Sequence, residues 1–174
     1  ASLALSALCF LGCGDQPPSR NTGSGAGQLS GRLIPPAGIA QEDGQWLTAA
    51  KDYASTRFSG LDQITTQNVA NLKVAWTFST GLTAGHEGAP LVAGSTMYLV
   101  MPFPNILYAL DLAQPGAALK WSYHPKPAAG AKGVACCDQV NRGPAFYNGR
   151  IYYNSLDGHA IAVDAGSGKE VWKT

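Results

Sequence analysis

A short motif that occurs twice constrains the fold of this chain more than any other feature. In each copy an Ala-x-Asp sequence is followed by a glycine-containing turn and then by an apolar stretch that ends in tryptophan, at Trp121 and at Trp172. Trp76 lies 45 positions before Trp121, and Trp172 lies 51 positions after it. A period of about 40–50 residues is typical of β-propeller blades. We therefore predict an all-β chain in which the tryptophan packs between neighbouring blades and the aspartate caps the turn.

Short segments rich in Val, Ile, Tyr and Trp alternate with turn residues from residue 45 onward, as in β-strands. The dipeptides Asn148-Gly149 and Asp157-Gly158 favour hairpin turns, because these residue types tolerate positive φ. Only residues 62–72 indicate a helical turn. A β-sandwich is the alternative fold, but it does not require a tryptophan at this interval. We expect strands at residues 74–78, 89–92, 96–101, 107–112, 119–123, 144–147, 150–155, 159–163 and 170–172.

The first 44 residues differ in composition from the rest of the chain. Residues 1–13 begin with an apolar run whose length fits an export signal, and a glycine precedes Cys13 as at bacterial lipoprotein cleavage sites. We expect lipidation of Cys13, and the alternative is an ordinary export signal cut nearby. Residues 14–44 are rich in Gly, Ser and Pro, which predicts a flexible linker. Residues 45–174 are predicted to be the N-terminal part of a propeller.

Charge and length narrow the possible classes of protein. Lys and Arg total 12 against 11 Asp and Glu, which leaves a net charge of +1. Binding to nucleic acid needs a basic patch or stripe, so we expect no nucleic-acid partner.

A propeller closes with roughly four to eight blades, whereas residues 45–174 suffice for about two and a half. We therefore expect an N-terminal fragment of a longer protein, with poor stability in isolation.

The adjacent Cys136 and Cys137 are the most unusual residues for chemistry. Neighbouring Cα atoms lie about 3.8 Å apart, which is less than the roughly 4.4–6.8 Å found in ordinary disulfides. A bond between these two cysteines would therefore close a strained ring, and an oxidising compartment would favour it. The alternatives are two free buried thiols, or a bridge from one of them to a cysteine after residue 174.

Two further positions carry polar groups that suit a ligand. Arg142 lies five positions after Cys137, and its planar guanidinium suits carboxylates and other anions. Together with a flat disulfide ring it would form one wall of a site for a flat anionic cofactor, and the alternative is a surface ion pair with Asp138. His86 and Glu87 lie between glycines just before a predicted strand, where they can approach a ligand closely. The alternative for this pair is a polar turn.

Three stretches together resemble the large subunit of the pyrroloquinoline quinone (PQQ)-dependent methanol and ethanol dehydrogenase family. They are residues 85–91 (GHEGAPL), 102–111 (PFPNILYALD) and 135–143 (ACCDQVNRG). The last stretch is highly specific, whereas the tryptophan repeat also occurs in propellers that are not enzymes. The resemblance implies an eight-bladed propeller with PQQ in its central channel. It also implies periplasmic oxidation of a primary alcohol to the aldehyde, with electrons passed to a cytochrome c.

The resemblance also implies roles for four residues. Cys136 and Cys137 would form a disulfide ring against one face of PQQ, and Glu87 and Arg142 would contact polar groups on its rim. A calcium or lanthanide ion is implied beside the quinone. Its ligands and the catalytic aspartate are expected after residue 174, so we expect no catalytic or metal-binding residue in this fragment.

The lipoprotein-like leader departs from what a soluble methanol dehydrogenase would have, and it suggests a periplasmic enzyme tethered to the membrane. The alternative function is a propeller lipoprotein scaffold of the outer-membrane assembly type, which binds no cofactor. That alternative leaves the combination of Cys136, Cys137, Glu87 and Arg142 unexplained. A third possibility is a family member that binds PQQ without turnover. A homodimer stays open, because the sequence does not determine the oligomeric state.

Overall fold

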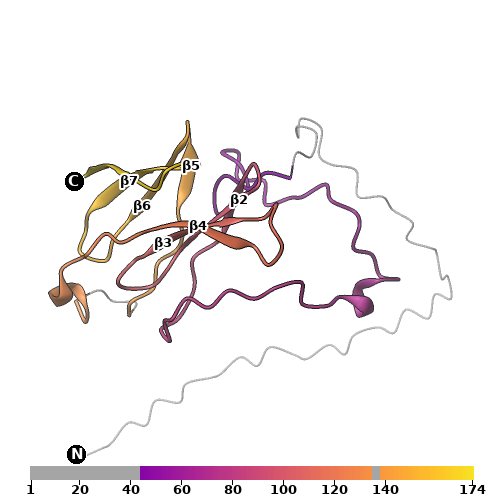
Figure 1. The fold of residues 1–174 in the computed structure, drawn as a ribbon, viewed down its shortest axis with the longest axis horizontal. Helices are drawn as coiled ribbons and strands as arrows, with labels where there is room; N and C mark the ends of the chain where they lie inside the picture. Colours follow the sequence, from indigo (N-terminus) through magenta and orange to yellow (C-terminus); the bar gives the residue numbers. More distant parts are fainter. Residues whose placement is uncertain (1–43, 135–137) are drawn as a thin grey trace, which may run out of the picture. The chain divides into compact units, whose positions relative to one another are not determined.

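The computed structural model describes residues 44–134 and 138–174. These residues form β-strands joined by turns and loops, with two single-turn 3-10 helices (Figure 1), which confirms the all-β prediction. In chain order the elements are η1 (Val69–Asn71), β1 (Leu91–Ala93), β2 (Thr96–Val100), β3 (Leu107–Asp111), β4 (Ala118–Tyr123), η2 (Ala129–Ala131), β5 (Ala145–Tyr147), β6 (Arg150–Asn154), β7 (Ala160–Asp164) and β8 (Glu170–Lys173).

The strands form two antiparallel sheets of four strands each, in the orders β1-β2-β3-β4 and β5-β6-β7-β8. Every strand pairs with its neighbour in the chain, so each sheet is one blade-like meander. The two sheets appear in Figure 1 as the magenta-to-orange group and the orange-to-yellow group. Eight of the expected strands lie within two residues of the observed bounds, and η1 lies inside the expected helical turn.

The aspartate of each repeat caps the turn before the last strand, as the repeat predicts. Asp111 Oδ1 accepts a hydrogen bond from the backbone N–H of Ala113 at 3.0 Å. Asp164 Oδ1 accepts bonds from the backbone N–H and the hydroxyl of Ser167, at 2.8 and 2.7 Å. These bonds from Ser167 hold the pKa of Asp164 below its ordinary value.

The tryptophan of each repeat lies opposite the small residue of the Ala-x-Asp sequence. Trp121 pairs in register with Ala109, and Trp172 pairs with Ala162. Both alanines are fully buried, and their small side chains leave room for the indole ring on the neighbouring strand. Trp121 also reaches Gly168 of the second sheet, where a Cβ atom would lie 2.6 Å from the indole Cδ2 atom. The predicted packing of tryptophan between blades is thereby confirmed for Trp121.

The core lies between the two sheets and is shared by them. Leu91 and Leu107 from the first sheet and Ile151 and Ile161 from the second are fully buried in one apolar cluster. Burial of this kind stabilises by about 1.5–3 kcal/mol for each side chain.

Two buried tyrosines also connect the sheets by hydrogen bonds. Tyr98 donates to the carbonyl oxygen of Ala165 and Tyr153 to that of Asn105, both at 3.1 Å. Asn105 is itself fully buried, and its side-chain oxygen accepts a bond from the backbone N–H of Leu156 at 2.8 Å. The polar groups of Tyr98, Tyr153 and Asn105 are thus paired across the interface, which helps to fix how the two sheets pack.

The strand expected at residues 74–78 is not formed, and this prediction was wrong for the described structure. Val74 is 80% exposed there, and the segment has no strand partner among the described residues. A strand needs a neighbouring edge for its backbone hydrogen bonds, so strand-forming residues alone do not suffice.

Both predicted hairpin turns are formed, but they differ in geometry. Asn148 and Gly149 have φ values of +46° and +72° and connect β5 directly to β6, which confirms that turn. The turn at Asp157-Gly158 also forms, between β6 and β7, and the pairing of Ser155 with His159 leaves residues 156–158 in the loop, as the expected strand bounds imply. Only Gly158 of that dipeptide has positive φ, at +85°.

Several expectations concern residues outside the described part of the chain. They are the export signal at residues 1–13 with Cys13, the linker up to residue 43, and the pair Cys136 and Cys137. Within residues 44–134 and 138–174, no helix has the length and apolar character needed to cross a membrane.

Candidate functional site

Glu87 and Arg142 come from equivalent places in the two repeats. Glu87 lies in the segment that leads from residues 73–79 to β1, and Arg142 lies in the segment that leads from β4 to β5. We call these two segments connections. In an antiparallel meander the start of the first strand and the end of the second lie at the same end of the sheet. Both residues therefore lie at one end of the sheets, which we call the loop end. The tight β1–β2 and β5–β6 turns form the opposite end.

The two side chains form an ion pair. Arg142 Nη1 lies 2.6 Å from Glu87 Oε2, and the side chains are 73% and 46% exposed. The sequence left an ion pair with Asp138 open as the alternative role of Arg142. In the described part of the chain the partner is Glu87 instead. The structure thus brings together the two residues expected on the cofactor rim, and their contact with a cofactor stays a prediction.

Two glycines allow the connections that carry this pair to touch. A Cβ atom on Gly88 would lie 2.8 Å from the carbonyl oxygen of Val100. A Cβ atom on Gly143, whose φ is +107°, would lie 2.8 Å from both the nitrogen and the oxygen of Ala89. Real Cβ contacts are essentially never that short, so side chains are excluded at both positions. The close approach that Gly88 permits here is to the protein's own backbone.

The side chain of His86 contacts residues of its own connection. Its Nε2 atom lies 2.9 Å from Thr80 Oγ1, and its Nδ1 atom lies 2.7 Å from the carbonyl oxygen of Ala84. Thr80 is also close to the first sheet, because Tyr108 donates a hydrogen bond to its carbonyl oxygen at 3.4 Å. This geometry supports the polar-turn interpretation for His86, and Glu87 alone faces Arg142.

Asn141 is a residue of this site that the sequence reasoning missed. Its side-chain Nδ2 donates to the carbonyl oxygen of Asn154 at 2.8 Å, and its Oδ1 accepts the backbone N–H of Gly143 at 3.0 Å. An asparagine two positions before a glycine commonly bonds to the backbone in this way, and that local signal could have identified it. Residues 140–143 and 154–156 line a groove of about 300 Å³ at the loop end.

A buried carboxylate holds the connection that leads to the cysteine pair. Asp157 accepts hydrogen bonds from Ser155 Oγ at 2.5 Å and from the backbone N–H of Ala128 at 2.9 Å, and His159 Nδ1 lies 3.0 Å away. Burial raises the pKa of the Asp157 carboxyl, but these hydrogen bonds outweigh it and hold the pKa well below its usual range. The ionised carboxylate therefore joins the second sheet to residues that precede Cys136.

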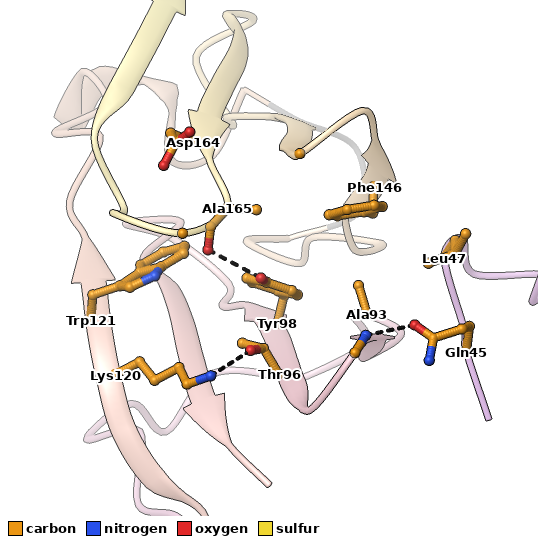
Figure 2. Close-up of a pocket in the computed structure, with 13 residues that line it drawn as sticks. Gln45, Leu47, Ala93, Thr96, Tyr98, Lys120, Trp121, Phe146, Asp164 and Ala165 are labelled. Atoms are coloured by element: carbon orange, nitrogen blue, oxygen red, sulfur yellow. Dashed lines mark hydrogen bonds between the residues drawn. The ribbon is translucent and has the colours of Figure 1, made fainter. Parts of the chain in front are cut away.

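A larger pocket of about 820 Å³ lies elsewhere, at the turn end of the sheets (Figure 2). The aromatic side chains of Tyr98, Trp121 and Phe146 line it, and the hydrogen bond from Tyr98 to Ala165 joins two of its lining residues. Of the residues expected at the cofactor, the two that the structure describes, Glu87 and Arg142, do not line it. It is therefore separate from the candidate site at the loop end.

The donor groups at the loop end fit one wall of a site for a flat anionic quinone. The guanidinium of Arg142 is exposed and can donate hydrogen bonds to a second anionic group beside Glu87. The groove between residues 140–143 and 154–156 lies beside it. Within the described residues no group of three or more His, Cys, Asp or Glu side chains is placed to hold a metal ion.

Comparison with known proteins relates residues 46–174 to one family, described as the PQQ glucose/ethanol/alcohol dehydrogenase β-propeller domain. The chain is 54% identical over 135 residues to the lanthanide-dependent methanol dehydrogenase of Methylacidiphilum fumariolicum (strain SolV), covering 78% of the chain and 22% of that protein. It is 43% identical over 140 residues to methanol dehydrogenase (cytochrome c) subunit 1 of Paracoccus denitrificans, covering 77% and 22%.

Solved structures agree with these relatives. The europium-containing methanol dehydrogenase superposes with a TM-score of 0.72 at 55% identity, covering 75% of this chain and 23% of that one. The chain thus spans about a fifth of the length of the curated relatives that it matches. The family fold confirms the propeller prediction over the β-sandwich. The chain belongs to the PQQ glucose/ethanol/alcohol dehydrogenase β-propeller family.

Proposed function

We propose that the protein containing this chain is a PQQ-dependent dehydrogenase that oxidises a primary alcohol of the methanol or ethanol class to the aldehyde. The observation that carries this proposal is the pairing of Glu87 with Arg142 at the loop end. Both residues belong to stretches on which the resemblance to the methanol dehydrogenases rests. The similarity to two methanol dehydrogenases over more than three quarters of the chain supports the substrate class.

The residues of this chain would bind and orient the cofactor. When bound, PQQ supplies the hydride acceptor, and a calcium or lanthanide ion supplies Lewis-acid activation of the quinone. Arg142 would hold an anionic group on the cofactor rim through its planar fork, and Glu87 would fix the other side of the guanidinium. A disulfide between Cys136 and Cys137 would provide a flat surface for one face of the quinone.

Two relatives indicate which metal and which electron acceptor to test. The 54% identity to a lanthanide-dependent enzyme exceeds the 43% identity to a cytochrome c-linked subunit, which favours a lanthanide as the first metal to supply. The name of the second relative supports a cytochrome c as the acceptor. The catalytic base and the metal ligands are proposed to lie outside this chain.

We also propose that the protein is periplasmic and tethered by lipid on Cys13. The apolar run before a Gly-Cys sequence supports this placement. Labelled palmitate fed to cells should appear on the exported protein. A Cys13→Ala variant should lose the label, and retention of the label by this variant would show that the anchor lies elsewhere. A homodimer would be tested on the same exported protein by its mass in solution.

The proposed function is tested on the full-length protein expressed for export. The apoprotein is supplied with PQQ and with either calcium or a light lanthanide, and methanol- or ethanol-dependent dye reduction is followed. Turnover that requires both PQQ and one metal supports the dehydrogenase. PQQ binding without turnover on methanol or ethanol overturns the proposed activity in favour of a sensor. A folded propeller that does not bind PQQ supports the scaffold alternative.

The cysteine pair has its own test in the same assay. Cys136→Ser removes the proposed disulfide and replaces none of the buried residues of the described core. We expect weaker PQQ binding or slower turnover with a nearly unchanged unfolding temperature. Wild-type binding and turnover in this variant would show that the pair does not form a wall of the cofactor site.

A further inference from the structure

We propose that Asn141 is a positioning residue for Arg142, so that the affinity for the cofactor depends on a side chain that does not touch it. This inference rests on the proposed function, because it assigns a role in the same site. It concerns the backbone on either side of Arg142 rather than the guanidinium itself.

The side-chain amide of Asn141 uses both of its polar atoms on backbone groups. The Nδ2 atom donates to the carbonyl oxygen of Asn154 at the end of β6, at 2.8 Å. The Oδ1 atom accepts the N–H of Gly143, at 3.0 Å. The amide therefore ties the residue after Arg142 to the residue before it, and attaches both to a strand of the second sheet.

The first sheet holds the same segment from the other side. The carbonyl oxygen of Arg142 accepts the N–H of Ala89 at 3.3 Å, and the carbonyl oxygen of Gln139 accepts the N–H of Phe103 at 2.8 Å. Gly143 packs directly on the backbone of Ala89, where a Cβ atom would lie at 2.8 Å. Asn141 is thus a side-chain link from this segment to β6, whereas the residues next to the first sheet hold its backbone by backbone bonds and contact the Arg142 side chain through Glu87.

Exposure explains why this link affects binding. The Arg142 side chain is 73% exposed, so packing does little to direct it. Its direction depends on the backbone that carries it and on the contact with Glu87. A binding group held by its supporting contacts loses less conformational freedom when it engages a ligand. Loss of the Asn141 link should therefore weaken ligand binding more than folding.

The chain offers a matched control in Asn68. Its Nδ2 atom donates to the carbonyl oxygen of Gln63, and its Oδ1 atom accepts the N–H of Thr65, both at 2.7 Å. The number and kind of hydrogen bonds are the same as for Asn141. These bonds lie at η1, in a different connection from the one that carries Arg142. Asn68→Ala therefore reports what the loss of such bonds does to stability alone.

The experiment uses the full-length apoprotein with PQQ as the probe. The dissociation constant is measured by quenching of tryptophan fluorescence, and the unfolding temperature is recorded for each variant. Wild type, Asn141→Ala, Asn68→Ala, Arg142→Ala and the Asn141→Ala/Arg142→Ala double variant are compared. We expect Asn141→Ala to raise the dissociation constant about tenfold and Asn68→Ala to leave it unchanged. In the Arg142→Ala background, Asn141→Ala should have no further effect, because it acts through Arg142.

The outcomes separate the two proposals. Wild-type protein that does not bind PQQ overturns the proposed function before any variant is read. Wild-type binding with an equal effect of Asn141→Ala and Asn68→Ala overturns the positioning role. An undiminished effect of Asn141→Ala in the Arg142→Ala background also overturns it, because the asparagine would then act by another route.

Discussion

The guanidinium of Arg142 lies 2.6 Å from the carboxylate of Glu87, although the two residues belong to connections of different sheets. The contact exists because Gly88 and Gly143 let the two connections touch through their backbones. The pair is exposed, and exposed ion pairs contribute about 0–1 kcal/mol to folding. The exposed charges are therefore available for binding, and their removal has little consequence for stability.

Replacement of Arg142 should separate binding from folding. We expect Arg142→Ala to raise the dissociation constant for PQQ at least tenfold and to leave the unfolding temperature of the full-length protein nearly unchanged. Arg142→Lys should restore only part of the affinity, because an ammonium lacks the planar fork. Fluorescence titration and thermal unfolding measure both quantities. Full affinity in the Arg142→Ala variant would remove this residue from the cofactor site.

Replacement of Gly143 should disturb both binding and folding. Gly143→Ala places a Cβ atom 2.8 Å from Ala89 N and O at a φ of +107°, so the two connections must move apart. We expect destabilisation by about 2–4 kcal/mol together with weaker PQQ binding. Gly81→Ala is the control, because Gly81 has a φ of +72° but nothing within 4 Å of its Cβ position. Equal losses in the two variants would show that the close approach is unimportant.

The stacking of Trp121 on Gly168 should hold the two sheets together. Trp121→Ala should destabilise the protein by about 2–4 kcal/mol, since the ring is only partly buried. Gly168→Ala should also destabilise, because its Cβ atom would lie 2.6 Å from the ring. Once the ring is removed, Gly168→Ala should cost only the strain of its positive φ, about 1 kcal/mol. Additive losses in denaturation of the double variant would argue against direct stacking.

Asp157 should make stability depend on pH in the acid range. Its pKa is lower in the folded protein than the roughly 3.9 of an unfolded chain, so the carboxylate stabilises the fold above about pH 4. This contribution is lost as the pH falls below about 4 toward the depressed pKa. Asp157→Asn should therefore lower the unfolding temperature at pH 7 and flatten its decline as the pH falls below about 4. Thermal unfolding at several pH values measures this profile, and a wild-type profile for Asp157→Asn would contradict the assignment.

The repeat motif was sufficient to predict the class of fold. Ala-x-Asp followed by a glycine turn and a tryptophan encodes the buried alanine, the capped turn and the packed indole ring within a dozen residues. These are local relationships, and the structure confirms them at Asp111, Asp164 and Trp121. The strand at residues 74–78 was predicted on the same local grounds and was wrong. Strand formation also depends on a partner edge, which no local pattern supplies.

The sequence by itself determined the family and two of the charged residues expected at its cofactor, Glu87 and Arg142. The types of these two residues, together with the residues next to them in the sequence, are sufficient to identify both. Only the tertiary structure decided that these two side chains meet, that Gly88 and Gly143 serve backbone packing, and that the side chain of Asn141 bonds to β6. Each of these contacts joins residues from different connections or sheets. Such contacts depend on how the two sheets pack, whereas a sequence motif reflects only residues that are close together along the chain.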